Sequence, residues 1–266
     1  MWGVVHDGYR PFEDTVQALT RFRADGGTVV LLSNAPVPND GVTSMLDERG
    51  VPRTAWDAIV TSGDIALRHV NERGYRRVLA VGPQDRDAAL FDRLDARLTP
   101  LADAEAIVCS GLDDDINETA ETYRPLLEQA HARALPFVCA NPDLVVDVGG
   151  RLYLCAGAIA DLYEDMGGEV FWAGKPHPPA YDAALASAAS MRGGARIDRR
   201  RVLAIGDAVR TDIAGAAQAG IDALFVASGI HRHDAMDGNR LSAARLAKLF
   251  PPDAPSAIAA MAALKW

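Results

Sequence analysis

Short apolar runs alternate with longer amphipathic segments along the whole chain. The runs end at polar or turn-forming residues, whereas the longer segments carry apolar residues at helical spacing. The apolar runs predict strands at residues 28–32, 58–61, 77–81, 106–109, 137–140, 169–172, 202–205 and 223–226. The amphipathic segments predict helices at residues 12–25, 40–49, 62–73, 86–94, 118–134, 156–166, 179–191 and 212–219. This alternation is typical of an α/β fold around a parallel sheet.

The last segment, residues 241–266, is rich in alanine and helical in pattern. We expect it to form a helix that packs on the core. Glycine pairs such as Gly26-Gly27 and Gly167-Gly168 follow predicted helices, where left-handed backbone is common.

Composition narrows the class of protein. Of the 266 residues, 49% are hydrophobic and 24% are charged, which is typical of a globular protein and excludes disorder as the main state. The chain has 27 Lys and Arg against 36 Asp and Glu, a net charge of −9, and no basic stripe. We therefore expect no nucleic-acid partner, because the electrostatic footprint for phosphate backbones is missing.

No apolar run reaches the length of a membrane span, and the N-terminus lacks the features of a signal peptide. Cys109, Cys139 and Cys155 lie far apart in apolar surroundings, so we interpret them as buried thiols in a reducing compartment. These features indicate a cytoplasmic protein with no membrane partner. The sequence does not determine the oligomeric state, so a homo-oligomer stays open as an alternative.

Polar residues follow three of the predicted strands directly. They are Ser33-Asn34 after residues 28–32, Lys175 after 169–172, and Asp207 after 202–205. The carboxyl ends of parallel strands share one edge of a sheet, and ligands bind outside that edge. We therefore expect these residues to converge on one site, with Ser33, Lys175 and Asp207 within about 15 Å of one another, the reach of one phosphate and its metal.

Asp207 and Asp212 lie five residues apart, one at a strand end and one at a helix start. Two neighbouring carboxylates suit Mg²⁺, which prefers hard oxygen ligands together with water and substrate phosphate. In the alternative interpretation, Asp207 is a turn residue and Asp212 caps the helix.

Ser33 and Asn34 offer a hydroxyl and backbone N–H groups that can bind a phosphoryl oxygen, or they form a turn before Pro36. Lys175 can neutralise a transferring phosphoryl group, or it is a solvated loop lysine. Each alternative stays open for the residue taken alone.

The order of these groups along the chain resembles the order of motifs in a known family. A hydroxyl, then a lysine, then Gly-Asp-x-x-x-Thr-Asp at residues 206–212 resembles motifs II, III and IV of the haloacid dehalogenase-like hydrolases. Four further segments are similar to class IIA members, the NagD-type and para-nitrophenyl or pyridoxal phosphate phosphatases: residues 140–143, 155–158, 172–178 and 216–220. The resemblance covers essentially the whole chain.

The resemblance implies a Rossmann-like core, residues 1–74 and 169–266, with an α/β cap inserted at residues 75–168. It also implies a Mg²⁺-dependent hydrolase of a small phosphorylated metabolite, in which an aspartate attacks phosphorus and water hydrolyses the aspartyl phosphate. By position, Ser33 would hold a phosphoryl oxygen and Lys175 would balance charge. Asp207 would bind Mg²⁺, and Asp212 would support the metal through water or Lys175.

Asn141 and Asp143 in the cap stand out as candidates for binding the substrate, together with the loop at residues 111–115. Asn-Pro-Asp is also a common turn, so a purely structural role is the alternative.

Motif I departs from the family pattern. Met1-Trp2-Gly3-Val4 aligns one residue after the nucleophilic aspartate, and Trp2 stands where the family has its acid/base aspartate. The Trp2 carbonyl aligns with a Mg²⁺ ligand, a role that needs no particular side chain. Asp7 and His6 are the nearby substitutes for the catalytic acid, and a polar loop is the alternative for both.

We therefore expect the natural protein to begin upstream with an apolar strand that ends in Asp. In this interpretation Met1 is an internal valine, whose GUG codon in a GC-rich gene was read as a start codon. The 266-residue form would then be inactive and less stable. The competing hypothesis is a phospho-ligand-binding pseudoenzyme. A dinucleotide-dependent oxidoreductase is disfavoured, because residues 78–83 contain one glycine of the Gly-x-Gly-x-x-Gly pattern.

Overall fold

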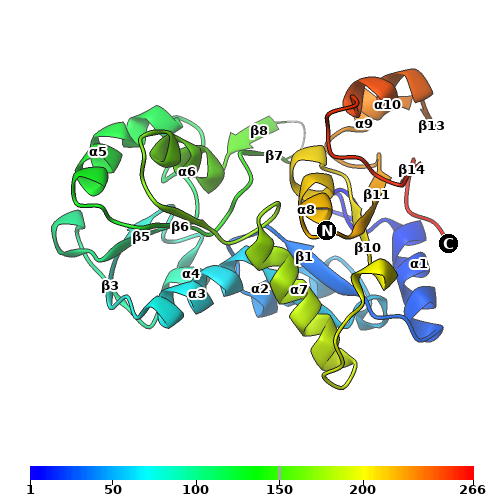
Figure 1. The fold of residues 1–266 in the computed structure, drawn as a ribbon, viewed down its shortest axis with the longest axis horizontal. Helices are drawn as coiled ribbons and strands as arrows, with labels where there is room; N and C mark the ends of the chain where they lie inside the picture. The colour runs from blue at the N-terminus through cyan, green and yellow to red at the C-terminus, as the bar shows by residue number, and fades with distance from the viewer. Residues whose placement is uncertain (149–150) are drawn as a thin grey trace. The chain divides into compact units, whose positions relative to one another are not determined.

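The chain forms two units in a computed structural model that describes residues 1–148 and 151–266 (Figure 1). Unit 1 comprises Met1–Ser33, Val42–Val60 and Pro176–Trp266, and unit 2 comprises Asn34–Gly41 and Thr61–Lys175. Both units combine helices with parallel strands, so the predicted α/β class is confirmed. The core and cap boundaries that the resemblance implies, at residues 75 and 168, stay a prediction.

Unit 2 is built on a five-stranded parallel sheet with the order β4-β3-β5-β6-β9. The strands are β3 (Arg77–Val81), β4 (Arg97–Leu98), β5 (Ala106–Cys109), β6 (Phe137–Cys139) and β9 (Val170–Trp172). The chain leaves β3 for β4 on one side and then crosses to β5 on the other. The direction of winding therefore reverses between β3 and β5, and in open parallel sheets such a point is where ligands bind.

Helices cover both faces of this sheet. Helices α5 (Arg124–Ala132) and α6 (Ala156–Asp165) pack on one face, where Phe137 and Tyr163 are fully buried. The Tyr163 hydroxyl donates to the Leu135 carbonyl at 2.7 Å. On the other face, α3 (Ser62–Arg73) places the His69 ring flat on Phe171 of β9, with 3.5 Å between ring centroids.

Shorter elements complete unit 2. They are α4 (Ala88–Phe91), the 3-10 turns η2 (Leu101–Asp103) and η3 (Ala120–Tyr123), and the antiparallel hairpin of β7 (Val145–Val148) and β8 (Arg151–Leu154). The three cysteines are buried and free, as the sequence predicts. Burial raises the pKa of each thiol, to about 12 for Cys155. They are therefore poor nucleophiles.

Unit 1 contains three small sheets. Strands β1 (Val30–Ser33) and β2 (Ala58–Thr61) pair, β10 (Leu203–Gly206), β11 (Asp222–Val226) and β14 (Ala259–Met261) form a parallel sheet, and β12 (Met236–Asp237) pairs with β13 (Arg240–Leu241). The helical elements wholly or largely in this unit are α1 (Glu13–Ala24), α2 (Asn39–Glu48), η1 (Arg53–Ala55), α7 (Pro178–Met191), η4 (Arg199–Arg201), η5 (Val209–Ile213), α8 (Ala214–Gln218), α9 (Arg232–Ala235) and α10 (Ala243–Leu249). Its core joins Val4, Ala18, Leu224, Val226 and Leu264.

Two parallel strands of unit 1 each have one open edge. Within the described residues, β1 pairs with β2 alone and β10 with β11 alone. Leu203 of β10 is 46% exposed, although it lies in a strand whose neighbour β11 is largely buried. Apolar strand edges are normally paired or covered in native proteins.

The predicted strands are confirmed within two residues at each end, but four predicted helical segments differ. The helix predicted over residues 86–94 is limited to α4, and the one predicted over 118–134 begins with the 3-10 turn η3. The segment expected to be helical over residues 212–219 begins earlier, as the π-helical turn η5. In the last segment only Ala243–Leu249 is helical, and Ala259–Met261 is a strand beside β11. Pro251, Pro252 and Pro255 end the helix, since proline removes a backbone donor. Within the described residues, no helix combines the length and hydropathy that crossing a membrane requires.

Removing a core aromatic side chain should destabilise unit 2. Phe137 is 0% exposed in β6, so we expect Phe137→Ala to lower the free energy of unfolding by about 3–5 kcal/mol, measured by urea denaturation. Tyr9→Ala is the control, because Tyr9 is 68% exposed and its loss should cost about 0.5 kcal/mol or less. Equal losses for the two variants would contradict the packing described.

Candidate active site

Asp212 holds the turn that follows β10. Its Oδ2 accepts hydrogen bonds from the backbone N–H groups of Asp207 and Ala208, both at 3.1 Å. A Cβ on Gly206 would lie 2.1 Å from the Asp212 Cβ, so only glycine fits there. The Tyr181 hydroxyl donates to the Asp212 carbonyl at 2.8 Å. Asp212 therefore shapes the loop that presents Asp207, but it lies within η5 and not at its N-cap, which is Ala208.

The Asp207 carboxylate lies between two glycine backbones. Its side chain is almost fully buried, and its Oδ2 accepts from the Ile230 N–H at 2.8 Å. A Cβ would lie 2.2 Å from this oxygen if built on Gly3, and 1.8 Å if built on Gly229. The Ser228 hydroxyl fixes the same region by donating to the Gly3 carbonyl at 2.8 Å. The N-terminal loop and the segment after β11 thus both approach Asp207.

The donors around Asp207 fit Mg²⁺ in kind. The Asp207 carboxylate lies close to the backbone of the N-terminal loop at Gly3. Among the described residues, no group of three or more His, Cys, Asp or Glu side chains could hold a metal ion. Mg²⁺ often takes only one or two carboxylates and completes its shell with water and substrate phosphate. The metal-binding roles predicted for Asp207, Asp212 and the Trp2 carbonyl stay predictions.

Asn34 clamps the loop that carries Lys175, and both belong to unit 2. The Asn34 amide donates to Asp143 Oδ1 at 2.9 Å and to the Lys175 carbonyl at 3.0 Å, while its Oδ1 accepts from the Lys175 N–H at 2.8 Å. Asn34 and Lys175 are both buried. Asn34 therefore positions Lys175 and Asp143, a role that the sequence interpretation as a phosphate ligand did not include.

Asn141 and Asp143 form the turn that Asn-Pro-Asp commonly makes. The Asp143 N–H donates to Asn141 Oδ1 at 3.2 Å. A Cβ on Gly157, at the start of α6, would lie within 2.6 Å of the carbonyl oxygens of Pro142 and Asp143. The turn is thus fixed against α6, and a substrate-binding role for Asn141 and Asp143 stays a prediction.

The predicted site residues are distributed over both units. Trp2, Ser33, Asp207 and Asp212 belong to unit 1, and Asn34, Asn141, Asp143 and Lys175 belong to unit 2. Within each unit, the residues named follow the carboxyl ends of parallel strands or the N-terminal loop. The predicted cluster of Ser33, Lys175 and Asp207 stays a prediction.

Asp7 caps its own loop. Its Oδ1 accepts from the N–H groups of Tyr9 at 2.8 Å and Arg10 at 2.7 Å, and these bonds lower the pKa of this exposed carboxyl. A general acid needs a proton near the working pH. The catalytic role predicted for Asp7 therefore gains no support from this geometry.

His6, the other predicted substitute, is fully buried and its Nδ1 accepts from the Gly8 N–H at 3.0 Å. The neutral ring then carries its proton on Nε2, which has no partner in the described part of the chain. Burial, with the charges of the N-terminal amine and Arg49, lowers its pKa to about 4. His6 is thus a neutral donor at physiological pH.

The sequence interpretation missed the segment after β11. Ser228, Gly229 and Ile230 secure Asp207 and the N-terminal loop, yet none carries a group that stands out in the sequence. The available signal is Ser228-Gly229, which follows the predicted strand 223–226 after one alanine and is found by the same strand-end rule that identified Asp207.

Comparisons with known proteins agree on one family. Haloacid dehalogenase-like hydrolases match residues 1–95, and a second family described as HAD-hydrolase-like matches residues 172–251. A haloacid dehalogenase-like hydrolase of Brucella suis is 43% identical with a TM-score of 0.84, over 99% of this chain and 93% of that one. The p-nitrophenyl phosphatase of Archaeoglobus fulgidus shares the fold, with 19% identity and a TM-score of 0.74 over 98% of this chain and 93% of that one.

A D-glycerol 3-phosphate phosphatase of Mycobacterium tuberculosis is 30% identical over 239 residues, which is 86% of this chain. This chain spans 62% of that relative's length. A crystal structure of glycerol phosphate phosphatase from the same organism, in complex with magnesium, is 26% identical with a TM-score of 0.63, over 86% of this chain and 66% of that one.

The buried imidazole of His6 should make stability depend on pH. Its pKa is about 4 in the folded chain and 6.5 when unperturbed. The unfolded chain therefore binds the proton first, so the contribution of His6 is complete above pH 6.5. It falls by about 3 kcal/mol as the pH drops from 6.5 to 4.

Urea denaturation of the 266-residue chain and of its His6→Gln variant across this range measures the effect. We expect the variant to lose less stability on acidification than the chain with His6. Equal pH dependence in the two proteins would show that His6 is not buried in its neutral form.

Proposed function

Because the chain belongs to the haloacid dehalogenase-like hydrolases, we propose that it is a Mg²⁺-dependent phosphatase of a small phosphorylated metabolite, acting through an aspartyl phosphate. The observation that carries this proposal is the Asp207 carboxylate, buried between Gly3 and Gly229 beside the N-terminal loop. The relatives named above include phosphatases, one of them in complex with magnesium.

Each residue has a proposed task. Asp207 and the Trp2 carbonyl bind Mg²⁺, which neutralises charge on the phosphoryl group when bound. Asp212 holds the Asp207 loop through two backbone hydrogen bonds. Ser33 donates to a phosphoryl oxygen, and Lys175 balances its negative charge. Asn34 keeps the Lys175 loop in place.

The nucleophile in this proposal is an aspartate that precedes Met1, at the end of an additional strand. The open edges of β1 and β10 support it, since apolar strands in native sheets are normally paired or covered at both edges. The half-exposed Leu203 would then be covered. Without that aspartate, we expect the 266-residue form to be inactive.

The second candidate function is binding of a phosphorylated ligand without turnover. Two observations favour it. Trp2 occupies the position of the family's acid/base aspartate, and the ionised, loop-capping Asp7 is a poor replacement. A pseudoenzyme needs Ser33 and Lys175 for phosphate binding but neither a nucleophile nor an acid.

Phosphate release from p-nitrophenyl phosphate tests the proposal. We compare the 266-residue chain with the protein that carries the in-frame segment encoded upstream, each with and without Mg²⁺. We expect release from the extended form with Mg²⁺ and none from the shorter form. In the extended form, Asp207→Asn should reduce the rate by about 100-fold or more, since it removes a metal ligand.

Asp237→Asn is the matched control, because Asp237 is exposed in the β12–β13 hairpin and should leave the rate unchanged. Full activity of Asp207→Asn would remove Asp207 from the mechanism. An extended form that binds phosphate esters without releasing phosphate would favour the pseudoenzyme.

A further inference from the structure

The segment that follows β11 contacts two separate parts of unit 1. Ser228, Gly229 and Ile230 are consecutive residues of this unit. The Ser228 hydroxyl donates to the Gly3 carbonyl at 2.8 Å. The Ile230 N–H donates to Asp207 Oδ2, also at 2.8 Å. A turn of three residues therefore connects the N-terminal loop to the carboxylate that follows β10.

Gly229, at the centre of this turn, lies directly against the carboxylate. A Cβ on Gly229 would lie 1.8 Å from Asp207 Oδ2, and a Cβ on Gly3 would lie 2.2 Å from the same oxygen. No side chain therefore separates either backbone segment from Asp207. The turn is held at its centre by this close approach, and Ser228 reaches the N-terminal loop from a fixed position.

Gly3 is the residue of the N-terminal loop that rotates most easily. Its φ is +78, and it lacks the Cβ that would restrict its backbone to fewer conformations. The peptide group before Gly3 contains the Trp2 carbonyl, which is the proposed ligand of Mg²⁺. The direction of that carbonyl therefore depends on what restrains Gly3.

Hydrogen bonds restrain the peptide groups on both sides of Gly3. The Gly3 N–H donates to the His6 carbonyl at 2.9 Å. In a planar trans peptide the N–H and C=O point in opposite directions, so the Trp2 carbonyl points away from the His6 carbonyl. The next peptide group is held at its own carbonyl by Ser228. This second restraint comes from a side chain far away in the sequence.

We propose that Ser228 is a positioning residue of the metal site. Its hydrogen bond to Gly3 fixes the orientation of the Trp2 carbonyl relative to Asp207, so the affinity for Mg²⁺ depends on this bond. The inference rests on the proposed function, which gives Asp207 and the Trp2 carbonyl as ligands. Ser228 contacts neither the metal nor the substrate in this proposal and acts through the backbone.

The chemistry of Mg²⁺ makes such a restraint effective. Mg²⁺ demands ligands in near-ideal octahedral geometry, so a carbonyl that can rotate is a poorer ligand than one already held in place. Residues that orient metal ligands typically change the affinity for the metal by about 10- to 100-fold. The single hydroxyl of Ser228 can therefore have a measurable effect without being a ligand itself.

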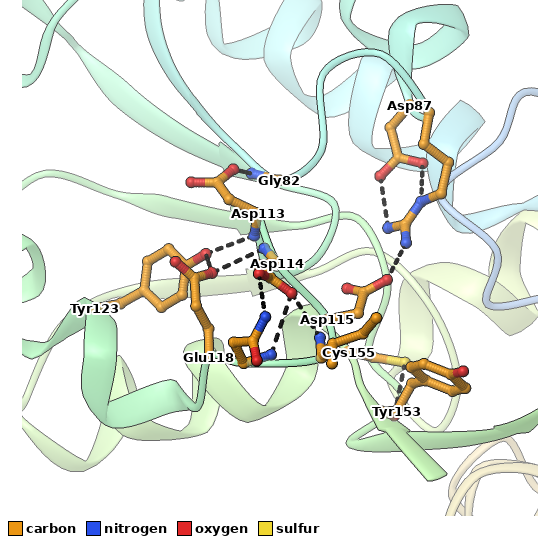
Figure 2. Close-up of polar contacts among 12 residues, drawn as sticks. Gly82, Asp87, Asp113, Asp114, Asp115, Glu118, Tyr123, Tyr153 and Cys155 are labelled. Carbon is orange, nitrogen blue, oxygen red and sulfur yellow. Dashed lines mark hydrogen bonds and ion pairs between the residues drawn. The ribbon is translucent and has the colours of Figure 1, made fainter. Parts of the chain in front are cut away.

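A group of consecutive carboxylates in unit 2 offers a second place for a cation and must be controlled for (Figure 2). Asp113 accepts from the Gly82 N–H at 3.0 Å. Asp115 pairs with Arg86, and Asp114 accepts from backbone N–H groups of its own turn. Metal held by this acidic group would not respond to a change at Ser228.

Binding of Mn²⁺ tests the inference without turnover. Mn²⁺ prefers the same carboxylate, carbonyl and water ligands as Mg²⁺, and the free ion is measured by its electron paramagnetic resonance signal. The dissociation constant is measured for the 266-residue chain and for the extended form, and each form that binds Mn²⁺ tests the inference. We expect Ser228→Ala to weaken binding about tenfold. Ser228→Thr keeps the hydroxyl and should restore the affinity to within about threefold.

Three further variants locate the effect. Asp207→Asn should abolish binding, whereas Asp114→Asn, the same change of charge in unit 2, should leave the affinity unchanged. Ser242→Ala is the matched serine control in unit 1, because the Ser242 hydroxyl accepts from the Arg245 N–H at the start of α10. Its loss should lower the melting temperature but leave the dissociation constant of Mn²⁺ unchanged.

An unchanged Mn²⁺ affinity in Ser228→Ala would overturn the inference, as would an equal loss in Ser228→Thr or in Ser242→Ala. A loss in Asp114→Asn as large as that in Asp207→Asn would assign the cation to unit 2 and overturn it as well. Binding that depends on Ser228, without phosphate release from the extended form, would contradict the proposed function alone. Absence of Mn²⁺ binding from both forms would contradict both proposals.

Discussion

The close approach of two backbone segments to one buried carboxylate determines how unit 1 is assembled around Asp207. No side chain fits at Gly3 or Gly229, because any Cβ would occupy the space of the Asp207 oxygen. The Ile230 N–H holds the carboxylate, and the Asp212 side chain holds its loop by accepting from the Asp207 N–H. A charge buried in this way is tolerated when hydrogen bonds or a cation offset its desolvation. The same arrangement therefore carries a desolvation cost, which a cation bound at Asp207 would offset.

Much of the fold follows from local sequence. The strands were predictable because buried parallel strands are continuous apolar runs that end at polar residues. Residues 241–266 were not, because their alanine content favours a helix while three prolines interrupt it and β11 offers an edge to Ala259–Met261. The π-helical turn at Val209–Ile213 was also hidden, since it depends on how Asp212 bonds back to its own loop.

The reactive groups of the site were predictable from the sequence, but the residues that hold them in position were not. Asp207 and Lys175 stand out because polar residues at strand ends are conspicuous. Asn34 looks like a ligand in sequence, yet its amide is engaged by Asp143 and the Lys175 backbone. Ser228 was missed, because its hydrogen bond to the N-terminal loop joins segments far apart in sequence. Contacts of this kind arise only when the strands are ordered into a sheet.

The open edge of β10 has a consequence for handling the protein. Its backbone N–H and C=O groups, with the half-exposed Leu203, form a template that another extended chain can extend. Whatever segment covers this edge also protects the chain from joining its copies through intermolecular sheets. Solubility at high concentration, and the tendency to aggregate during refolding, thus depend on how this edge is covered.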